Sequence, residues 1–176
     1  MGHSHSSNEF IAIKIAIMTI SDSRTEETDT AGQLLVDRLN DAGHQLAEKI
    51  IVQDNKYRIR EVMSRWIADD DVQAVVTTGG TGLTGRDITP ESVRPLFDKE
   101  IEGFGETFRW LSYQHIKTST IQSRAFAGLA NGTPIFCLPG SPGACRDGWD
   151  EIISHQLDMR HKPCNLIEMM PRFTEV

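Results

Sequence analysis

The chain has 176 residues and a net charge of −7, with 39% hydrophobic and 24% charged residues. A chain of this length and composition is typical of one globular domain with a core large enough to fold unaided. The acidic balance argues against a nucleic-acid-binding protein, because phosphate backbones are bound through clustered Lys and Arg. A small anionic ligand is still compatible with this charge, since one local site can be positive on an acidic protein.

The cysteine pattern and the hydropathy of the chain favour the cytoplasm. Three cysteines, none of them in a CxxC pair, argue against a disulfide framework or a zinc knuckle. No segment resembles a signal peptide or a membrane span, so we expect a cytoplasmic protein without membrane contacts. We expect a disordered tail over residues 1–9, one domain over residues 10–162 and a C-terminal tail over residues 163–176.

The first half of the chain alternates predicted strands with predicted helices. Residues 10–20 and 74–78 are apolar and rich in β-branched side chains, which is typical of buried strands, and we expect a further strand between them over residues 44–52. Between them we expect a helix capped by one of residues 28–30 and a second helix over residues 57–67, where apolar side chains recur at helical spacing. This β-α-β-α-β order predicts a parallel sheet with right-handed crossovers.

The second half predicts three more helices and a further strand. Residues 89–91, Thr-Pro-Glu, are a typical helix start, with threonine as the cap, proline in the first turn and glutamate complementing the dipole. Residues 103–115 and 144–156 have helical spacing, and residues 133–138 are typical of a strand. The small apolar residues 123–129 are compatible with either a helix end or an edge strand.

A glycine-rich segment, VVTTGGTGLTGRDITPE at residues 75–91, follows the third predicted strand. It contains a literal G-x-G-x-x-G, but a Rossmann fingerprint follows the first strand and has an acidic residue at the end of the next strand. Here the acidic residues about twenty positions later, within 100–102, enter a helix instead. A P-loop would need Lys after its last glycine, where this chain has Arg86. The segment therefore fits neither of these familiar sites.

The same segment still favours a phosphate-bearing ligand. Consecutive glycines leave backbone N–H groups open to a ligand, and neighbouring threonines add hydroxyl donors. Asp87 is suited to Mg²⁺, which takes one or two carboxylates together with phosphate oxygens. A second carboxylate, Asp54, follows the second predicted strand and would face the same edge of the sheet. The candidate ligand-binding residues of the segment are Thr78, Gly79, Gly80, Thr81 and Gly82.

Two further loops are expected at that edge. Residues 138–143, LPGSPG, also follow a strand and open a helix, so Gly140 and Ser141 are placed to bind an anion. Ser21 and Ser23 follow the first strand. Four strand ends thus contribute polar or glycine-rich loops to one rim, which is where open α/β sheets bind ligands.

Each of these features also has a purely structural interpretation. Glycine loops form tight turns, Asp54 could cap a helix, and Arg124 could pair with a surface carboxylate. His44 is expected at the surface or its boundary. Cys137 is expected in the core, whereas Cys145, on an early helical turn, could have a lowered pKa.

Taken together, TTGGTGLTGRDITPE, the upstream Asp54 and SRAFAGLANGTPIFCLPGSPGACRDGWDEII resemble the MoaB/MogA family of molybdenum-cofactor biosynthesis proteins. The resemblance extends from about residue 13 to residue 157. It is closest to the bacterial MoaB branch, through SDSRT at residues 21–25 and EGFGE at residues 102–106. It implies a three-layer α/β fold around a mainly parallel sheet, and assembly as a homotrimer or homohexamer.

The resemblance also implies an activity. Family members bind molybdopterin, and the active ones transfer AMP from ATP to the molybdopterin phosphate and release pyrophosphate. Asp54 and Asp87 match the family's functional aspartates by position, so we expect Asp87 to hold Mg²⁺ and Asp54 to position or activate the reacting phosphate. The glycine loop should approach the nucleotide or pterin phosphate, and Gly140 and Ser141 should line the second part of the pocket. Other proteins of the cofactor pathway are the expected partners.

Two alternatives stay open. The first is a molybdopterin-binding carrier or scaffold that does not turn over ATP. The second is an unrelated nucleotide-binding reductase that uses the literal G-x-G-x-x-G, although the strand context of that motif is wrong here. Bound pterin without ATP consumption would support the carrier, and nicotinamide binding would support the reductase.

Overall fold

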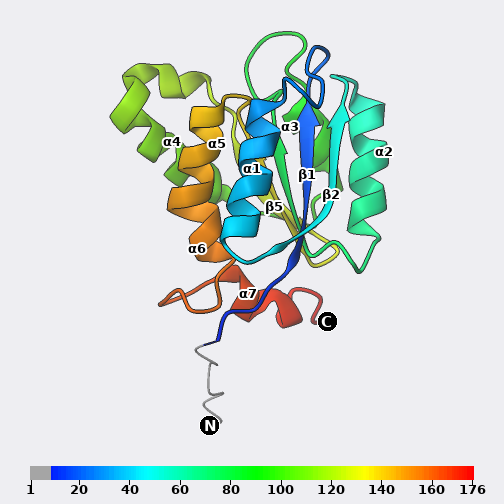
Figure 1. Ribbon diagram of the computed structural model, residues 1–176, viewed down its shortest axis with the longest axis vertical. Helices are drawn as coiled ribbons and strands as arrows, with labels where there is room; N and C mark the ends of the chain where they lie inside the picture. The colour runs from blue at the N-terminus through cyan, green and yellow to red at the C-terminus, as the bar shows by residue number, and fades with distance from the viewer. Residues whose placement is uncertain (1–8) are drawn as a thin grey trace.

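The computed structural model describes residues 9–176, so nearly all of the expected N-terminal tail lies outside the described residues. Helices cover both faces of one six-stranded sheet with the strand order β2-β1-β3-β6-β5-β4 (Figure 1). This arrangement confirms the three-layer α/β fold expected from the sequence. No helix among residues 9–176 is long and apolar enough to cross a membrane.

The sheet is parallel on one side and antiparallel on the other. Four strands are parallel: β2 (Gln45–Val52), β1 (Lys14–Ile20), β3 (Ala74–Thr78) and β6 (Thr133–Leu138). The antiparallel pair is β5 (Phe126–Ala130) and β4 (Lys99–Glu100).

Two strand predictions need correction. The first strand begins at Lys14 rather than at residue 10, and Ile11 before it is exposed. The segment predicted as a helix end or an edge strand is β5, which lies inside the sheet because β4 covers its outer side. With only two residues, β4 is too short for a periodic pattern to predict it.

The helices divide between the two faces of the sheet. Contacts in the core place α1, α4 and α5 on one face and α2 and α3 on the other, as Figure 1 shows. From Pro142 to Gln156 the helical chain is unbroken, because a π-helical turn joins α5 to α6. The helices are α1 (Thr30–Asp41), α2 (Lys56–Ile67), α3 (Thr89–Val93), α4 (Glu102–Ile116), α5 (Pro142–Gly148), α6 (Ser154–Gln156) and α7 (Leu166–Met169).

Alternate residues of β1 supply both halves of the core. Ile15 and Ile17 pack toward α1, α4 and α5, whereas Ala16 and Met18 pack toward α2, and all four side chains are fully buried. A strand that is buried on both faces is uniformly apolar rather than alternating, which explains the apolar run in this part of the sequence.

Strand order places the candidate site. The chain leaves β1 toward β2 on one side and returns to β3 on the other, so the carboxyl ends of β1 and β3 form a topological switch point. Gly79, directly after β3, has φ +105°, and a Cβ there would lie 2.3 Å from the Ile20 carbonyl oxygen. Glycine therefore allows the loop after β3 to touch the end of β1.

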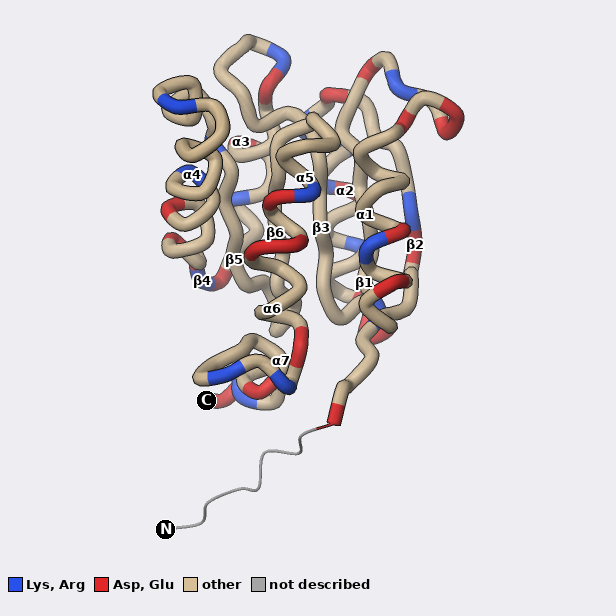
Figure 2. Tube along the Cα trace, turned by 60° about the vertical axis from the view of Figure 1, so that its left-hand side comes forward, with Lys and Arg blue, Asp and Glu red and all other residues tan. Residues whose placement is uncertain are grey.

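The opposite end of the sheet holds both ends of the described chain (Figure 1 and Figure 2). In the segment predicted as a C-terminal tail, α7 packs Ile167 into the core, where this side chain is 6% exposed. His44, predicted near the surface, is buried beside Phe10 and Trp149, and its Nδ1 accepts a hydrogen bond from Ile13 N. Burial lowers the pKa of His44.

The contact at Gly79 predicts a specific loss of stability. Gly79→Ala should destabilise the fold by about 2–3 kcal/mol, because a side chain at this φ is strained and its Cβ overlaps a carbonyl. Gly103→Ala is the matched control, since nothing lies within 4 Å of a Cβ at Gly103 in α4, and its effect should stay within about 1 kcal/mol. Urea unfolding of both variants measures the difference, and equal midpoints would contradict the steric explanation.

Candidate functional site

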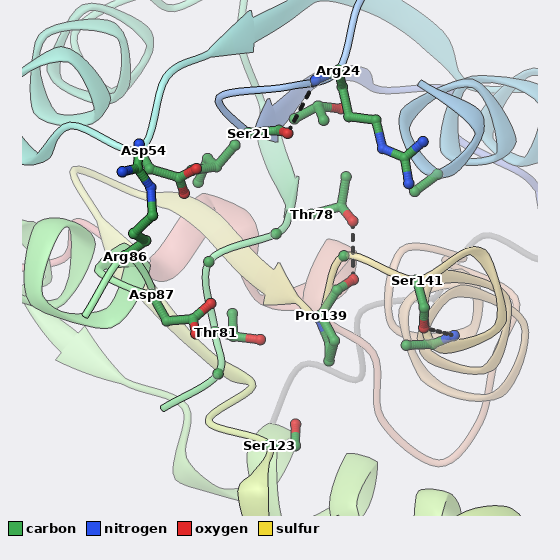
Figure 3. A pocket seen from close by; sticks show the side chains of 18 of the residues that line it. Ser21, Arg24, Asp54, Thr78, Thr81, Arg86, Asp87, Ser123, Pro139 and Ser141 are labelled. Atoms are coloured by element: carbon green, nitrogen blue, oxygen red, sulfur yellow. Dashed lines mark hydrogen bonds between the residues drawn. The ribbon is translucent and has the colours of Figure 1, made fainter. Parts of the chain in front are cut away.

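A cavity of about 520 Å³ opens at the carboxyl edge of the parallel strands. Loops after β1, β2, β3 and β6 form its rim, and Figure 3 shows side chains from these loops converging on it. Of the predicted site residues, Ser23 does not line the cavity. The predicted residues that do line it are Ser21, Asp54, Thr78, Gly79, Gly80, Thr81, Gly82, Asp87, Gly140 and Ser141.

The glycine loop after β3 is fixed by Thr89, the first residue of α3. Thr89 Oγ1 donates to Gly79 O at 2.8 Å, and Thr89 N donates to Gly80 O at 3.0 Å. Thr89 was predicted to cap α3, but the cap residue is Ile88 and the threonine hydroxyl holds the glycine loop instead. Within the described residues, the N–H groups of Gly80 and Thr81 donate no hydrogen bond, so they remain available to a ligand.

The loop after β6 forms the facing side of the cavity. Ser141 caps α5 by accepting a hydrogen bond from Ala144 N at 3.2 Å. The N–H groups of Gly140 and Ser141 have no acceptor among residues 9–176. They lie at the N-terminus of the long helical segment that starts at Pro142, where helix dipoles favour anions.

Thr78 connects the two loops rather than offering a free donor. Its hydroxyl donates to Pro139 O at 2.9 Å and accepts from Cys145 Sγ at 3.1 Å, so its single proton is already used. The expectation of a lowered pKa for Cys145 is wrong, because burial raises the pKa of this thiol to about 11. Cys137 is fully buried in the core, as predicted.

Asp87 is held in its ionised form by a tight turn. Thr84 donates to Asp87 Oδ2 from its backbone N at 2.8 Å and from its hydroxyl at 2.6 Å. Partial burial alone would raise the pKa of Asp87, but the hydrogen bonds from Thr84 and from the Gly82 backbone, together with the charge of Arg124, outweigh it, and the pKa lies below its ordinary value. Both Thr84 bonds use Oδ2.

Asp54 has the opposite electrostatic character. It is paired with Asp22, since each residue's backbone N donates to the other's carboxylate at 3.1 Å. Burial raises the pKa of Asp54, and the nearby charge of Asp22 raises it further. Arg86 forms an ion pair with Asp22, and this contact lowers the pKa of Asp22. Figure 3 shows Asp54, Arg86 and Asp87 on the same side of the cavity.

One wall of the cavity was not predicted. Phe108, Ser112 and Ile116 of α4 line it, followed by Gln122 and Ser123. No motif marks these residues, because their role depends on how α4 crosses the sheet. Arg24 and Arg86 were also missed as lining residues, although each stands beside a residue that was predicted.

The described residues contain no group of three or more His, Cys, Asp or Glu side chains arranged to hold a metal ion alone. Mg²⁺ is usually bound by one or two carboxylates together with substrate phosphates. Asp87, ionised and facing a cavity with free N–H donors, fits a metal that arrives with a phosphate ligand.

Residues 16–159 match the family model described as "Probable molybdopterin binding domain". Molybdenum cofactor biosynthesis protein B of Escherichia coli K12 is 57% identical over 159 residues, covering 90% of this chain and 94% of that protein. The chain therefore belongs to the family of molybdenum-cofactor biosynthesis proteins that this model describes. The Bacillus subtilis protein of the same name is 41% identical over 146 residues, covering 82% and 86% of the two chains.

Solved structures of the family agree with the fold. A crystal structure of molybdenum cofactor biosynthesis protein B superposes with a TM-score of 0.81 at 44% identity, covering 84% of this chain and 92% of that one. The tungsten cofactor synthesizing protein MoaB of Pyrococcus furiosus gives a TM-score of 0.74 at 38% identity, covering 82% and 92%. These comparisons confirm the resemblance to MoaB and MogA proteins.

The coupling of Asp54 to Asp22 predicts the direction of a titration. Asp22→Asn removes a negative charge beside Asp54 and keeps an acceptor for Asp54 N, so the pKa of Asp54 should fall. Carboxyl ¹³C NMR titration measures this shift, with the Asp54 signal assigned through Asp54→Asn. Asp71→Asn, at an exposed carboxylate paired with Lys14, is the control and should leave the Asp54 signal unchanged. A pKa that stays constant or rises in Asp22→Asn would contradict the coupling.

Proposed function

We propose that the chain binds molybdopterin and catalyses its Mg-ATP-dependent adenylylation. A phosphate oxygen of molybdopterin attacks the α-phosphorus of ATP, a new P–O bond forms, and the bond to the pyrophosphate leaving group breaks. The products are adenylylated molybdopterin and pyrophosphate. Membership of the molybdenum-cofactor biosynthesis family supports the substrate class.

The observation that carries this proposal is the pair of facing loops with free N–H groups. Gly80 and Thr81 on one side and Gly140 and Ser141 on the other offer donors to phosphate oxygens across a single cavity. Such preorganised donors stabilise the charge that spreads over the oxygens of a transferring phosphoryl group. Two separate phosphate-binding loops suit a reaction that brings two phosphate-bearing substrates together.

The two aspartates take different roles because their environments differ. Asp87, with its lowered pKa, stays ionised and is the residue that would hold Mg²⁺, which neutralises phosphate charge when it is bound. Asp54, with its raised pKa, is better suited to orient the attacking phosphate and to accept a proton from it. The separation of the two pKa values in one cavity is a common feature of catalytic sites.

The wall from α4 gives the cavity an apolar side. Ile116 is exposed and Phe108 behind it is buried in the core, so Ile116 is the apolar side chain of this wall that a flat ring system of pterin or adenine could contact. Ser123, which is only partly buried, adds a hydroxyl group to the cavity lining. Ligand sites commonly combine an apolar lining with a few polar groups that fix orientation.

The proposal extends to assembly and location. We propose a cytoplasmic homotrimer or homohexamer that cooperates with other proteins of the cofactor pathway. Several large apolar side chains are exposed on the loop after β3, on α4 and on the segment after α4, which supports coverage of these segments by another subunit. They include Leu83, Trp110, Tyr113 and Ile121, whose exposed fractions are between 47% and 77%.

A molybdopterin carrier that does not turn over ATP is the second candidate. It is favoured by the family description, which names binding and no reaction. A carrier would use the same cavity and bind molybdopterin tightly without forming a product. The presence of both Asp54 and Asp87 in the cavity lining favours the enzyme.

Replacement of the two aspartates tests the proposal. Asp87→Asn and Asp54→Asn should each lower turnover about 100-fold, because each removes a group that acts on a reacting phosphate. Adenylylated molybdopterin and pyrophosphate are measured with purified protein, molybdopterin, ATP and Mg²⁺. Asp71→Asn is the matched control, since Asp71 is exposed and bonds to Lys14, and its turnover should equal that of the unchanged chain.

The outcomes separate the two candidates. Product that depends on Asp87 supports the adenylyltransferase. Tight molybdopterin binding without product supports the carrier, and full turnover in both Asp54 and Asp87 variants would overturn the assignment of these residues.

A further inference from the structure

The loop that carries Asp87 has little contact with the body of the protein along most of its length. Residues 83–86 are exposed, and the bonds from Thr84 to Asp87 close the loop only on itself. Arg86 reaches Asp22 from the exposed end of the loop. The position of the Asp87 carboxylate therefore depends on what holds the two ends of the loop, Gly82 and Asp87.

Arg124 holds these two ends together. Its Nε donates to Gly82 O at 2.8 Å and its Nη2 donates to Asp87 O at 2.7 Å, so one guanidinium joins the first and last residues of the loop. Its backbone N also donates to Thr81 O at 3.0 Å. Among residues 9–176, Arg124 is the side chain from outside the loop that bonds to the carbonyls at both of its ends.

Glu91 fixes the guanidinium from a third side. Its carboxylate pairs with Nη1 of Arg124, and this contact lowers the pKa of Glu91. The Arg124 side chain is 29% exposed, so its charge is partly withdrawn from water and its hydrogen bonds are less screened than those of a surface pair. The expected pairing of Arg124 with a carboxylate is thus correct but incomplete, because the same side chain also holds two loop carbonyls.

We infer that Arg124 is a positioning residue for Asp87, acting through the backbone of the glycine loop rather than by contact with substrate. The inference rests on the proposed adenylylation. A planar guanidinium can bond to two carbonyls and a carboxylate at once, and Lys cannot reproduce this geometry with a single ammonium. Loss of these Arg124 hydrogen bonds would let Asp87 shift relative to the cavity in which it would hold Mg²⁺.

Arg124→Lys tests the inference. The Mg²⁺ concentration for half-maximal turnover should rise about 10–100-fold, which is typical when a group that orients a metal ligand is removed. Turnover at saturating Mg²⁺ should change much less, because Asp87 itself is retained. Glu91→Gln weakens the contact that orients the Arg124 guanidinium while keeping an oxygen acceptor. It should therefore shift the Mg²⁺ requirement in the same direction by a smaller factor.

Arg94→Lys is the matched control. Arg94 is also a partly exposed arginine paired with a glutamate, but its partner is Glu100, and it bonds to no described residue of the glycine loop. Its Mg²⁺ requirement should match that of the unchanged chain. A wild-type Mg²⁺ requirement in both Arg124→Lys and Glu91→Gln would overturn the inference.

A second readout does not depend on turnover. Backbone amide exchange across residues 79–91, measured by mass spectrometry, should be faster in Arg124→Lys than in the unchanged chain or in Arg94→Lys. If the unchanged chain forms no product, the proposed function fails, and the exchange rates still decide whether Arg124 holds the loop. Equal exchange in all three proteins would show that it does not.

Discussion

The site depends on one close backbone contact, between the end of β1 and the turn after β3. A Cβ at Gly79 would lie 2.3 Å from Ile20 O, and Gly79 N donates to Leu138 O at the end of β6. Three strand ends therefore meet at a single glycine. A Cβ at Gly140 would lie only 3.3 Å from Gly79 Cα, so the second loop also approaches the same point. The two loops face each other across one cavity because glycine permits this approach.

The polar groups around this contact divide into those that maintain the structure and those that are left for a ligand. Buried N–H and hydroxyl groups need partners, and Gly79 N, Thr78 Oγ1 and Thr89 Oγ1 all find them within the protein. Gly80 N and Thr81 N donate to no described residue, and they lie at the cavity wall, where water or ligand can satisfy them. Neighbouring residues of this loop thus provide both the internal hydrogen bonds that fix it and the N–H groups that are left for a ligand.

The sequence was sufficient to predict the layout of the site but not its internal connections. Helices and strands with a strong hydrophobic periodicity were predicted from the sequence, and the glycine loop was correctly placed after the third strand. The α4 wall was missed because contacts between residues far apart in the chain leave no local pattern. The same reason explains Asp22, whose pairing with Asp54 joins the ends of β1 and β2, and Thr89, whose hydroxyl serves the loop rather than its own helix.

Sheet topology explains why a literal G-x-G-x-x-G need not mark a dinucleotide site. In a Rossmann domain the glycines join the first strand to the helix whose N-terminus receives the pyrophosphate. Here they follow β3, and the next helix, α3, has only five residues and is linked to the glycine loop through Thr89 and Glu91. The long helical segment that points its N-terminus at the cavity starts instead at Pro142, after β6. One Rossmann turn combines the backbone freedom of glycine with a helix dipole, whereas here two separate loops supply them to the same cavity.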